Sequence, residues 1–300
     1  MRDKASRTAA DVAYLRAINS LAPLPQRIMH DPLALAMIPP PWRITRPLLA
    51  LPGGAAALHR LTQTASRVLA GASGLPELIA IRFRHIEERL QLALQQGCRQ
   101  IVLLGAGYDF RPYRPELAQL RIIEIDHPQT QAAKRALLQQ CGRPLPANVC
   151  YLPVDFMGDW AASLADSGLL LDVPTLVIWE GVIYYLDRHA VDYTFNALAR
   201  LLPAGSRIVF DCVPDLQRCE IARECPHIQR VARYVAGKGE PFLWGALRSE
   251  VEQLLQQFDY RLNAIETFDA ILRRLMLAER LDVACAPILR HFFLVEAGIG

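Results

Sequence analysis

Five short apolar runs alternate with longer helical stretches through the middle of the chain. The runs cover residues 101–104, 121–125, 148–153, 175–179 and 206–211, and each fits a buried strand and is too short for a helix. Helices are predicted for residues 55–71, 76–96, 129–141, 160–170 and 191–202. This alternation predicts an α/β fold, in which a parallel sheet carries helices on both faces.

The two ends of the chain follow other patterns. Residues 1–75 hold short helical segments interrupted by prolines, one capped by Ser6 or Thr8 and one by Asp31. Residues 214–250 hold no convincing strand, whereas helices at 249–258 and 268–280 and strands at 260–266 and 288–296 follow. We predict one domain, 1–300, comprising an N-terminal helical cap (1–75), a cofactor-binding core (76–213), a helical lid insertion (214–250) and C-terminal helices and strands that complete the sheet (251–300).

A glycine turn follows the first predicted strand. Gly105 and Gly107 stand where the backbone must turn sharply and admit a close approach, and the second strand ends in Asp126. A strand, a glycine turn, a crossover and a strand ending in a carboxylate are typical of a site for a ribose-bearing cofactor. Right-handed crossovers bring successive strand ends to one edge of the sheet, so Asp155 and Glu180 are expected in the same crevice.

The loop itself argues against a dinucleotide. In the fingerprint G-x-G-x-x-G a third glycine and helix amides receive a pyrophosphate, but Phe110 stands at the third glycine position here. Asp109 within the loop would also repel phosphate. Carboxylates around the crevice suit a positively charged cofactor without phosphates, and S-adenosyl-L-methionine fits. A nicotinamide oxidoreductase stays open as a minor alternative.

Four motifs now carry a resemblance to a known family. They are LGAGYDFRPYR (104–114), IEIDHP (123–128), PVDF (153–156) and WEGVIYYL (179–186), together with SRTAADVAYLRA near the N-terminus and IRFRHIEERL at 81–90. In this order they resemble the family of leucine carboxyl methyltransferases and tetracenomycin-type polyketide O-methyltransferases. Phe110, where the family usually has threonine, and Tyr184, where it often has Leu or Met, depart from the pattern. The match fades after about Pro214.

The resemblance implies a Rossmann-like methyltransferase fold with a mostly parallel seven-stranded sheet, and a set of cofactor-binding residues. The implied set is Arg82, Gly105, Ala106, Gly107, Asp109, Asp126, Asp155, Phe156 and Glu180. Arg82 would pair with the methionine carboxylate, and the glycine loop would approach the methionine part of the cofactor. Asp126 would accept hydrogen bonds from both ribose hydroxyls. Asp155 and Phe156 would flank the adenine, and Asp109 and Glu180 would take the ammonium group.

The acceptor is left open by the sequence. Tyr185, at the family's tyrosine position, could orient the acceptor or simply pack beside the cofactor. A carboxylate acceptor needs no general base, whereas a hydroxyl acceptor normally requires one. The candidate bases are His127, His189 and His227. The favoured function is O-methylation of a carboxylate or hydroxyl on a small molecule, for example a polyketide-like or other secondary metabolite. Alternatives are a protein C-terminal carboxyl methyltransferase and a non-catalytic cofactor-binding protein.

Composition and charge indicate which partners and which cellular compartment to expect. A net charge of +3 over 300 residues gives no indication of nucleic-acid binding. The seven cysteines include no CxxC pair, which is typical of reduced thiols in a cytoplasmic protein. No signal peptide and no run long enough to span a bilayer is evident, so no membrane partner is expected. The spacing of Cys219, Cys225 and His227 matches no common zinc site, so no metal is predicted. Arginines 218, 223, 230 and 233 could meet an acidic acceptor, although a solvated helix face is the more typical interpretation. Monomer and homodimer both stay open.

Overall fold

The computed structural model describes residues 4–69, 74–216 and 226–300. The end of the predicted helix 55–71, part of the predicted lid, and Arg218, Arg223, Cys219 and Cys225 lie outside this description.

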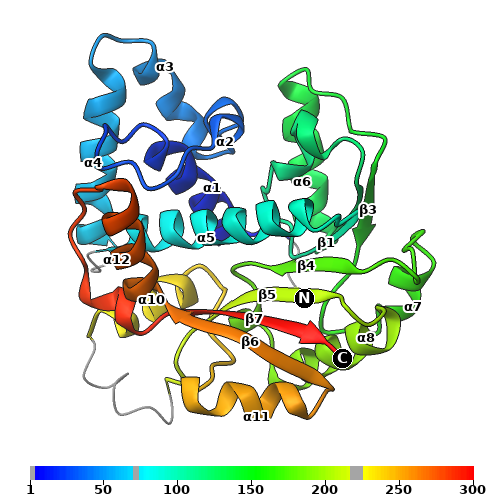
Figure 1. Cartoon of the computed structure of the whole chain (residues 1–300). Coiled ribbons are helices and arrows are strands. Elements are labelled where there is room, and N and C mark those ends of the chain that lie inside the picture. Colours follow the sequence, from blue (N-terminus) through cyan, green and yellow to red (C-terminus); the bar gives the residue numbers. More distant parts are fainter. Residues whose placement is uncertain (1–3, 70–73, 217–225) are drawn as a thin grey trace.

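A seven-stranded sheet forms the centre of the molecule (Figure 1). Its strands are β1 (Gln100–Leu104), β2 (Arg121–Asp126), β3 (Val149–Pro153), β4 (Thr175–Trp179), β5 (Arg207–Cys212), β6 (Tyr260–Thr267) and β7 (Phe293–Ile299). The order is β3-β2-β1-β4-β5-β7-β6, with β1 to β5 parallel and β7 antiparallel to both of its neighbours. The predicted Rossmann-like fold with a mostly parallel seven-stranded sheet is confirmed. All five residues of β1 and of β4 are buried, which explains their continuous apolar runs.

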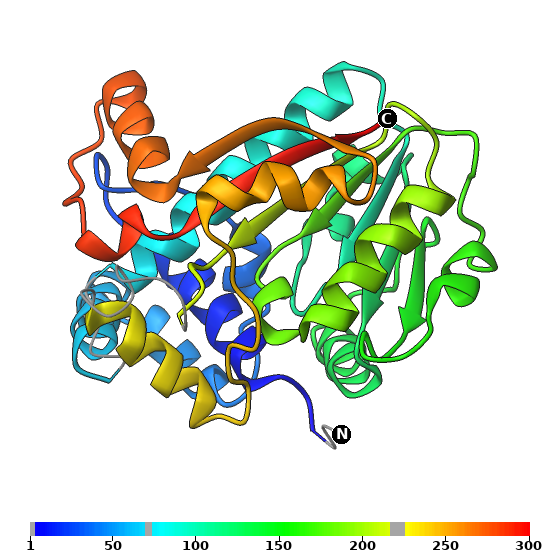
Figure 2. The same cartoon turned by 90° about the horizontal axis from the view of Figure 1, so that it is seen from below.

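Helices cover both faces of this sheet. In Figure 1, α5 (Leu75–Gln95) lies on one face, and α8 (Arg188–Leu201) and α11 (Val251–Gln256) lie on the other, as Figure 2 shows from below. The other helices are α1 (Arg7–Asn19), α2 (Pro32–Ala36), α3 (Arg46–Leu49), α4 (Gly54–Leu69), α6 (Pro128–Gln140), α7 (Ala161–Ala165), α10 (Pro226–Ala236) and α12 (Phe268–Glu279). None of the helices within the described residues combines the length and the apolar character needed to cross a bilayer.

The N-terminal helices form a cap whose apolar side chains share a cluster with Tyr108, Phe110, Leu137 and Leu138. Ser6 caps α1 by accepting the amide of Ala9, and Asp31 caps α2 by accepting the amide of Ala34. Apolar side chains of α1 and α2 pack together in a second cluster that also includes Phe110. In Figure 2, α1 lies beyond the carboxyl ends of the parallel strands, which is where the crevice is expected.

Three predicted elements differ from the structure. The helix predicted at 160–170 is only α7, because Gly168 adopts a left-handed conformation (φ +80°) that interrupts helical geometry. The strand predicted at 288–296 begins at Phe293, since residues 287–290 form a 3-10 turn that starts at Pro287. Within the described part of the predicted lid, α10 is helical but residues 237–247 are not; three glycines and Pro241 lie in that stretch.

Candidate active site

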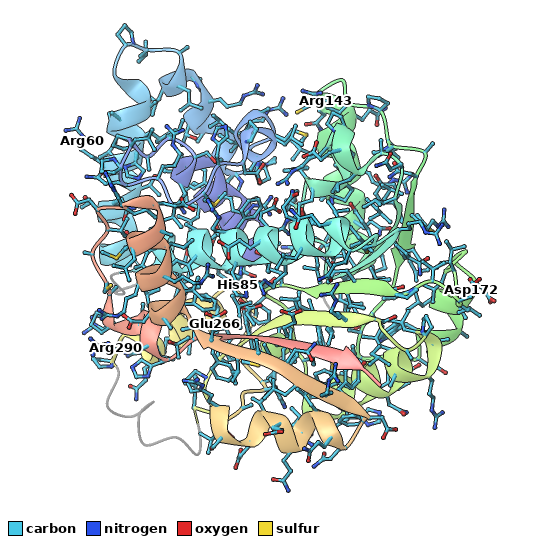
Figure 3. The ribbon with its side chains drawn as sticks, viewed as in Figure 1. Arg60, His85, Arg143, Asp172, Glu266 and Arg290 are labelled. Atoms are coloured by element: carbon cyan, nitrogen blue, oxygen red, sulfur yellow. The ribbon has the colours of Figure 1, made fainter. Side chains whose placement is uncertain are left out.

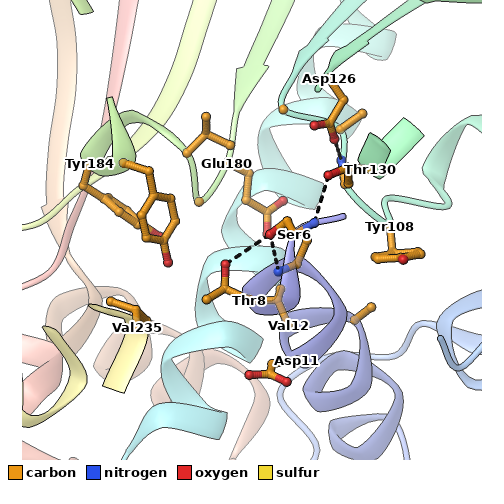
Figure 4. A pocket seen from close by; sticks show the side chains of 18 of the residues that line it. Ser6, Thr8, Asp11, Val12, Tyr108, Asp126, Thr130, Glu180, Tyr184 and Val235 are labelled. Atoms are coloured by element: carbon orange, nitrogen blue, oxygen red, sulfur yellow. Dashed lines mark hydrogen bonds between the residues drawn. The ribbon is translucent and has the colours of Figure 1, made fainter. Parts of the chain in front are cut away.

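One cavity of about 450 Å³ opens at the carboxyl ends of β1, β2 and β4 (Figure 4). The glycine loop and the ends of these strands line one part of it, and α1, α5, α10, Gly239 and residues 241–243 line the rest. Its size is typical of a pocket for a small molecule or cofactor. All ten residues predicted from the sequence line this cavity: Arg82, Gly105, Ala106, Gly107, Asp109, Asp126, Asp155, Phe156, Glu180 and Tyr185.

The glycine loop begins directly after β1. Gly105 and Gly107 both have positive φ, +67° and +46°, which L side chains rarely adopt. A Cβ atom at Gly105 would lie 2.2 Å from Cγ2 of Val182, so no larger residue fits there. The close approach predicted at Gly105 is therefore made by the protein itself, between the loop and the segment after β4.

Asp126 is held by the loop it faces. Its Oδ2 accepts the amide of Gly107, and its Oδ1 accepts the amide of His127 at 2.6 Å. Burial raises the pKa of this carboxyl to about 6, and the two amides offset part of that effect. Each oxygen retains a second lone pair, so the ionised carboxylate could accept two further hydrogen bonds from the cavity.

Asp155 and Phe156 lie at the same end of the cavity, after β3. Asp155 Oδ1 accepts the amide of Met157 at 3.0 Å. The ring of Phe156 packs edge-on against Trp160, with centroids 5.7 Å apart. An acceptor and a fixed aromatic face thus stand close to Asp126, an arrangement that suits a purine base.

Buried arginines hold the remaining carboxylates. Glu180 Oε1 accepts Arg82 Nε at 3.1 Å, and its Oε2 accepts Arg111 Nη1 at 2.9 Å. The same Nη1 donates to Asp109 Oδ2 at 2.6 Å. Burial alone would raise the pKa of Glu180 and of Asp109, but Arg111 and its neighbours outweigh burial and lower both. Both carboxylates are therefore ionised at neutral pH, and both form ion pairs with guanidinium groups.

Arg82 has further partners besides Glu180. Its Nη1 donates to the Tyr184 hydroxyl at 3.1 Å and to Asp211 Oδ2 at 3.0 Å. Asp211 is fully buried at the end of β5 and also accepts the amide of Gly181 at 2.6 Å. The predicted contacts of Arg82, Asp109 and Glu180 with a cofactor remain predictions, and each would be made by a group that is already oriented.

A second part of the cavity is apolar. It is lined chiefly by Val12, Leu15, Leu78, Ile79, Val182, Tyr184, Tyr185, Leu186, Val235, Phe242 and Leu243. The rings of Tyr184 and Phe242 pack edge-on with centroids 4.9 Å apart, and Tyr185 packs against both. Of the three histidines considered as bases, only His127 lines the cavity, and it follows Asp126 at the other end.

A roof closes over the cavity, formed by α1 and the segment after α10. Thr8 donates its amide to Glu240 Oε2 at 3.2 Å, and its hydroxyl donates to the same oxygen. Asp11 accepts Lys238 Nζ and, at 3.0 Å, the hydroxyl of Tyr234. Figure 4 shows Ser6 and Thr8 at the start of α1, with the amide of Ser6 bonded to Thr130.

Several residues of this site were not predicted from the sequence. Arg111 stands within the motif LGAGYDFRPYR and Asp211 ends a predicted strand, so both carried a signal that could have been used. Thr8 was considered only as a helix cap. Nothing in the sequence around Glu240 distinguishes it from a surface residue. No cluster of three potential metal ligands occurs among the described residues.

The fold resembles those of a candidate methyltransferase from Thermobifida fusca YX (TM-score 0.55, 17% identity, 87% of this chain and 94% of that one) and a DUF574 family protein from Streptomyces avermitilis MA-4680 (TM-score 0.56, 17% identity, 86% and 96%). These likenesses show that the fold is Rossmann-like. The model of the family described as leucine carboxyl methyltransferase matches residues 9–199, and the chain belongs to this family.

Curated relatives agree with this assignment. One from Mycobacterium ulcerans (strain Agy99) is 31% identical over 238 residues, which cover 77% of this chain and 73% of the relative. Another, from Mycobacterium marinum (strain ATCC BAA-535 / M), is 35% identical over 153 residues, which cover 50% and 49%. The chain therefore spans about half the length of the latter relative. Both are described as candidate S-adenosyl-L-methionine-dependent methyltransferases, and that is the cofactor predicted from the sequence.

Proposed function

We propose that the protein is an S-adenosyl-L-methionine-dependent O-methyltransferase acting on a small, largely apolar acceptor. One observation carries the proposal: a single cavity joins the complete predicted set of cofactor side chains to a chamber of aliphatic and aromatic side chains. A cofactor with a cationic centre and no phosphate suits the first part, and an apolar acceptor suits the second.

The residues present fit this cofactor. Asp126 would hold the ribose diol, while Asp155 and Phe156 would hold the adenine. Arg82 would pair with the methionine carboxylate, and Glu180, aided by Asp109, would face the ammonium. When bound, the cofactor supplies an electrophilic methyl group on a sulfonium. The chain's own task is to align the acceptor oxygen with that methyl group and to exclude water, because alignment supplies most of the rate.

An ionised carboxylate is the acceptor group that this chamber favours. No histidine among the described residues lines the apolar part, and Asp11 already accepts hydrogen bonds from Lys238 and Tyr234. A hydroxyl acceptor would need a base, whereas a carboxylate arrives deprotonated. Burial raises the pKa of Tyr185, which keeps its hydroxyl protonated and able to donate to such a carboxylate. Tyr185 is accordingly proposed to orient the acceptor.

A protein C-terminal carboxylate is the second candidate, favoured by the description of the family. The roof argues for the small molecule, because α1 and residues 238–240 are bonded across the cavity and leave less room for a protein surface.

The experiment that tests the proposal uses cofactor carrying a labelled methyl group. The protein would be incubated with apolar carboxylic acids, matched phenols and alcohols, and peptides ending in a free carboxylate. We expect labelled methyl esters of the apolar acids, detected by mass spectrometry and released by mild base. Labelled peptides in place of small esters would support the second candidate, and bound cofactor without any product would support a non-catalytic protein.

A further inference from the structure

The cap carries a long segment without acidic residues. Residues 32–76 contain no Asp or Glu, although one residue in ten of the whole chain is acidic. The same segment contains Arg43, Arg46, Arg60 and Arg67. Its charge is therefore positive at every pH at which the protein is folded, since arginine does not lose its proton.

Within this segment, residues 40–61 form a tip that presents large apolar side chains to solvent. Ile44 is 84% exposed, Leu51 58% and Leu61 62%, and Leu48 is also exposed. They come from the 3-10 turn Trp42–Thr45, from α3, from the turn after α3 and from α4. This cap tip projects from the body of the molecule in Figure 1. Several such side chains on neighbouring elements indicate an interaction surface rather than scattered surface residues.

Arginines stand among these apolar side chains. Arg46 and Arg60 are exposed, and within the part of the chain that the structure describes neither forms an ion pair with a carboxylate. Arg60 lies at the outer edge of the molecule in Figure 3. Apolar side chains beside arginine, without carboxylates, are the composition of segments that lie in the interface of an anionic bilayer.

We propose that the cap tip binds the surface of an anionic lipid bilayer. Ile44, Leu48 and Leu51 would enter the headgroup region, and Arg46 and Arg60 would bind lipid phosphates. A projecting tip suits a flat, deformable lipid surface, whereas a peptide is usually bound in a groove. The sequence-based expectation of no membrane partner depended on the absence of a spanning run, and surface binding needs none.

The cap tip is joined to the roof of the cavity. The Tyr14 ring of α1 stacks on Trp42 with centroids 4.5 Å apart, and its hydroxyl lies 3.3 Å from that of Thr62 on α4. Residues of α1 line the cavity. Binding at the tip would therefore hold the roof close to the bilayer. The inference stands on the cap alone and does not depend on the proposed catalytic function.

The test is co-flotation of the full chain with vesicles. Vesicles of phosphatidylcholine and phosphatidylglycerol in equal parts would be compared with phosphatidylcholine alone, at low and high salt. We expect retention on the anionic vesicles that weakens with salt and is reduced roughly tenfold or more in an Ile44→Asp/Leu51→Asp variant and in an Arg46→Glu/Arg60→Glu variant.

Leu277 provides a matched control, because it is a leucine that is 85% exposed and belongs to α12, outside the cap. A Leu277→Asp variant should bind vesicles like the unsubstituted protein, and circular dichroism would establish that all variants are folded. Absence of retention on either vesicle, or equal loss in the Leu277→Asp variant, would overturn the inference. A dimer in solution that the Ile44→Asp/Leu51→Asp change converts to monomer, without vesicle binding, would assign the tip to a second copy instead.

Discussion

Asp126 is the single residue on which cofactor binding should depend most. Its carboxyl has a pKa raised to about 6 by burial, and only the ionised form accepts hydrogen bonds from two ribose hydroxyls. Affinity for S-adenosylhomocysteine should therefore be constant above about pH 7 and fall as the pH drops through 6. The measurement is a titration at several pH values.

An Asp126→Asn variant is the control for that pH dependence. It should bind weakly at every pH and show no inflection near pH 6, because the titrating group is gone. An inflection that persists in the variant would assign the pH dependence to another group.

Gly105 offers a test of backbone geometry at the residue scale. Gly105→Ala combines a left-handed φ with a Cβ that would overlap Val182, so it should lower the free energy of unfolding by about 3 kcal/mol or more. Gly97 also has a positive φ, but nothing lies within 4 Å of its Cβ position. Gly97→Ala should therefore cost only about 1 kcal/mol in the same urea titration. Equal costs would show that the loop can move away from Val182.

Much of the site could be predicted at this scale. Strand ends with a glycine or a carboxylate identified Gly105, Asp126, Asp155 and Glu180, because parallel topology forces such positions together. The partners of those carboxylates could not be predicted in the same way. Arg111 reaches Glu180 only through the packed geometry of the 3-10 turn Arg111–Tyr113 against α5, and side-chain direction is not encoded in a spacing pattern.

At the scale of elements, Arg111 connects three segments. It bonds Asp109 in the glycine loop, Glu180 after β4 and Glu87 on α5, and its side chain is 2% exposed. Arg111→Met would remove the ion-pair partner of Asp109 and one of the two partners of Glu180 and of Glu87, and should cost about 3–5 kcal/mol of stability at pH 8. Among the described residues Arg114 forms an ion pair with Glu87 alone, and its side chain is more exposed, so Arg114→Met should cost about 1 kcal/mol or less.

The pH dependence of this loss has a definite sign. The pKa values of Asp109 and Glu180 are lowered in the folded protein, so the stability that Arg111 provides is present above the ordinary carboxyl pKa of about 4 and is lost on acidification. Denaturant unfolding should therefore show a smaller difference between Arg111→Met and the unsubstituted protein at pH 4 than at pH 8. A difference that does not change with pH would mean that Arg111 acts through packing alone.

The roof joins α1 to the segment after α10. Glu240→Ala removes the acceptor of Thr8 and should speed dissociation of the cofactor by about tenfold, the effect of roughly 1.4 kcal/mol, with little change in association. Arg233→Ala, on the exposed side of α10, is the matched control and should leave both rates unchanged. Stopped-flow kinetics would measure the rates, and equal dissociation from both variants would show that the roof does not retain the cofactor.

Elements with one dominant signal were predicted well. Fully buried strands appear as apolar runs, so β1 and β4 were located within a residue, whereas the predicted helix at 160–170 ran past Gly168 because its neighbours Leu169 and Leu170 continue the apolar pattern.

For the whole molecule, the sequence indicated a parallel sheet with a cap but not how the cap closes. The bond between Thr8 and Glu240 joins positions 232 residues apart. Such a contact depends on the arrangement of all intervening elements, so no local sequence pattern predicts it. The strand order, with β7 between β5 and β6, was likewise not predicted, because the apolar runs do not show which strands are neighbours.

The central claim is that the cavity binds S-adenosyl-L-methionine, and calorimetry with S-adenosylhomocysteine tests it most directly. We predict saturable binding of one molecule per chain, severe weakening in Asp126→Ala, and no heat on titration with NADH. Absence of binding by S-adenosylhomocysteine and S-adenosyl-L-methionine, or binding of NADH in their place, would contradict the account.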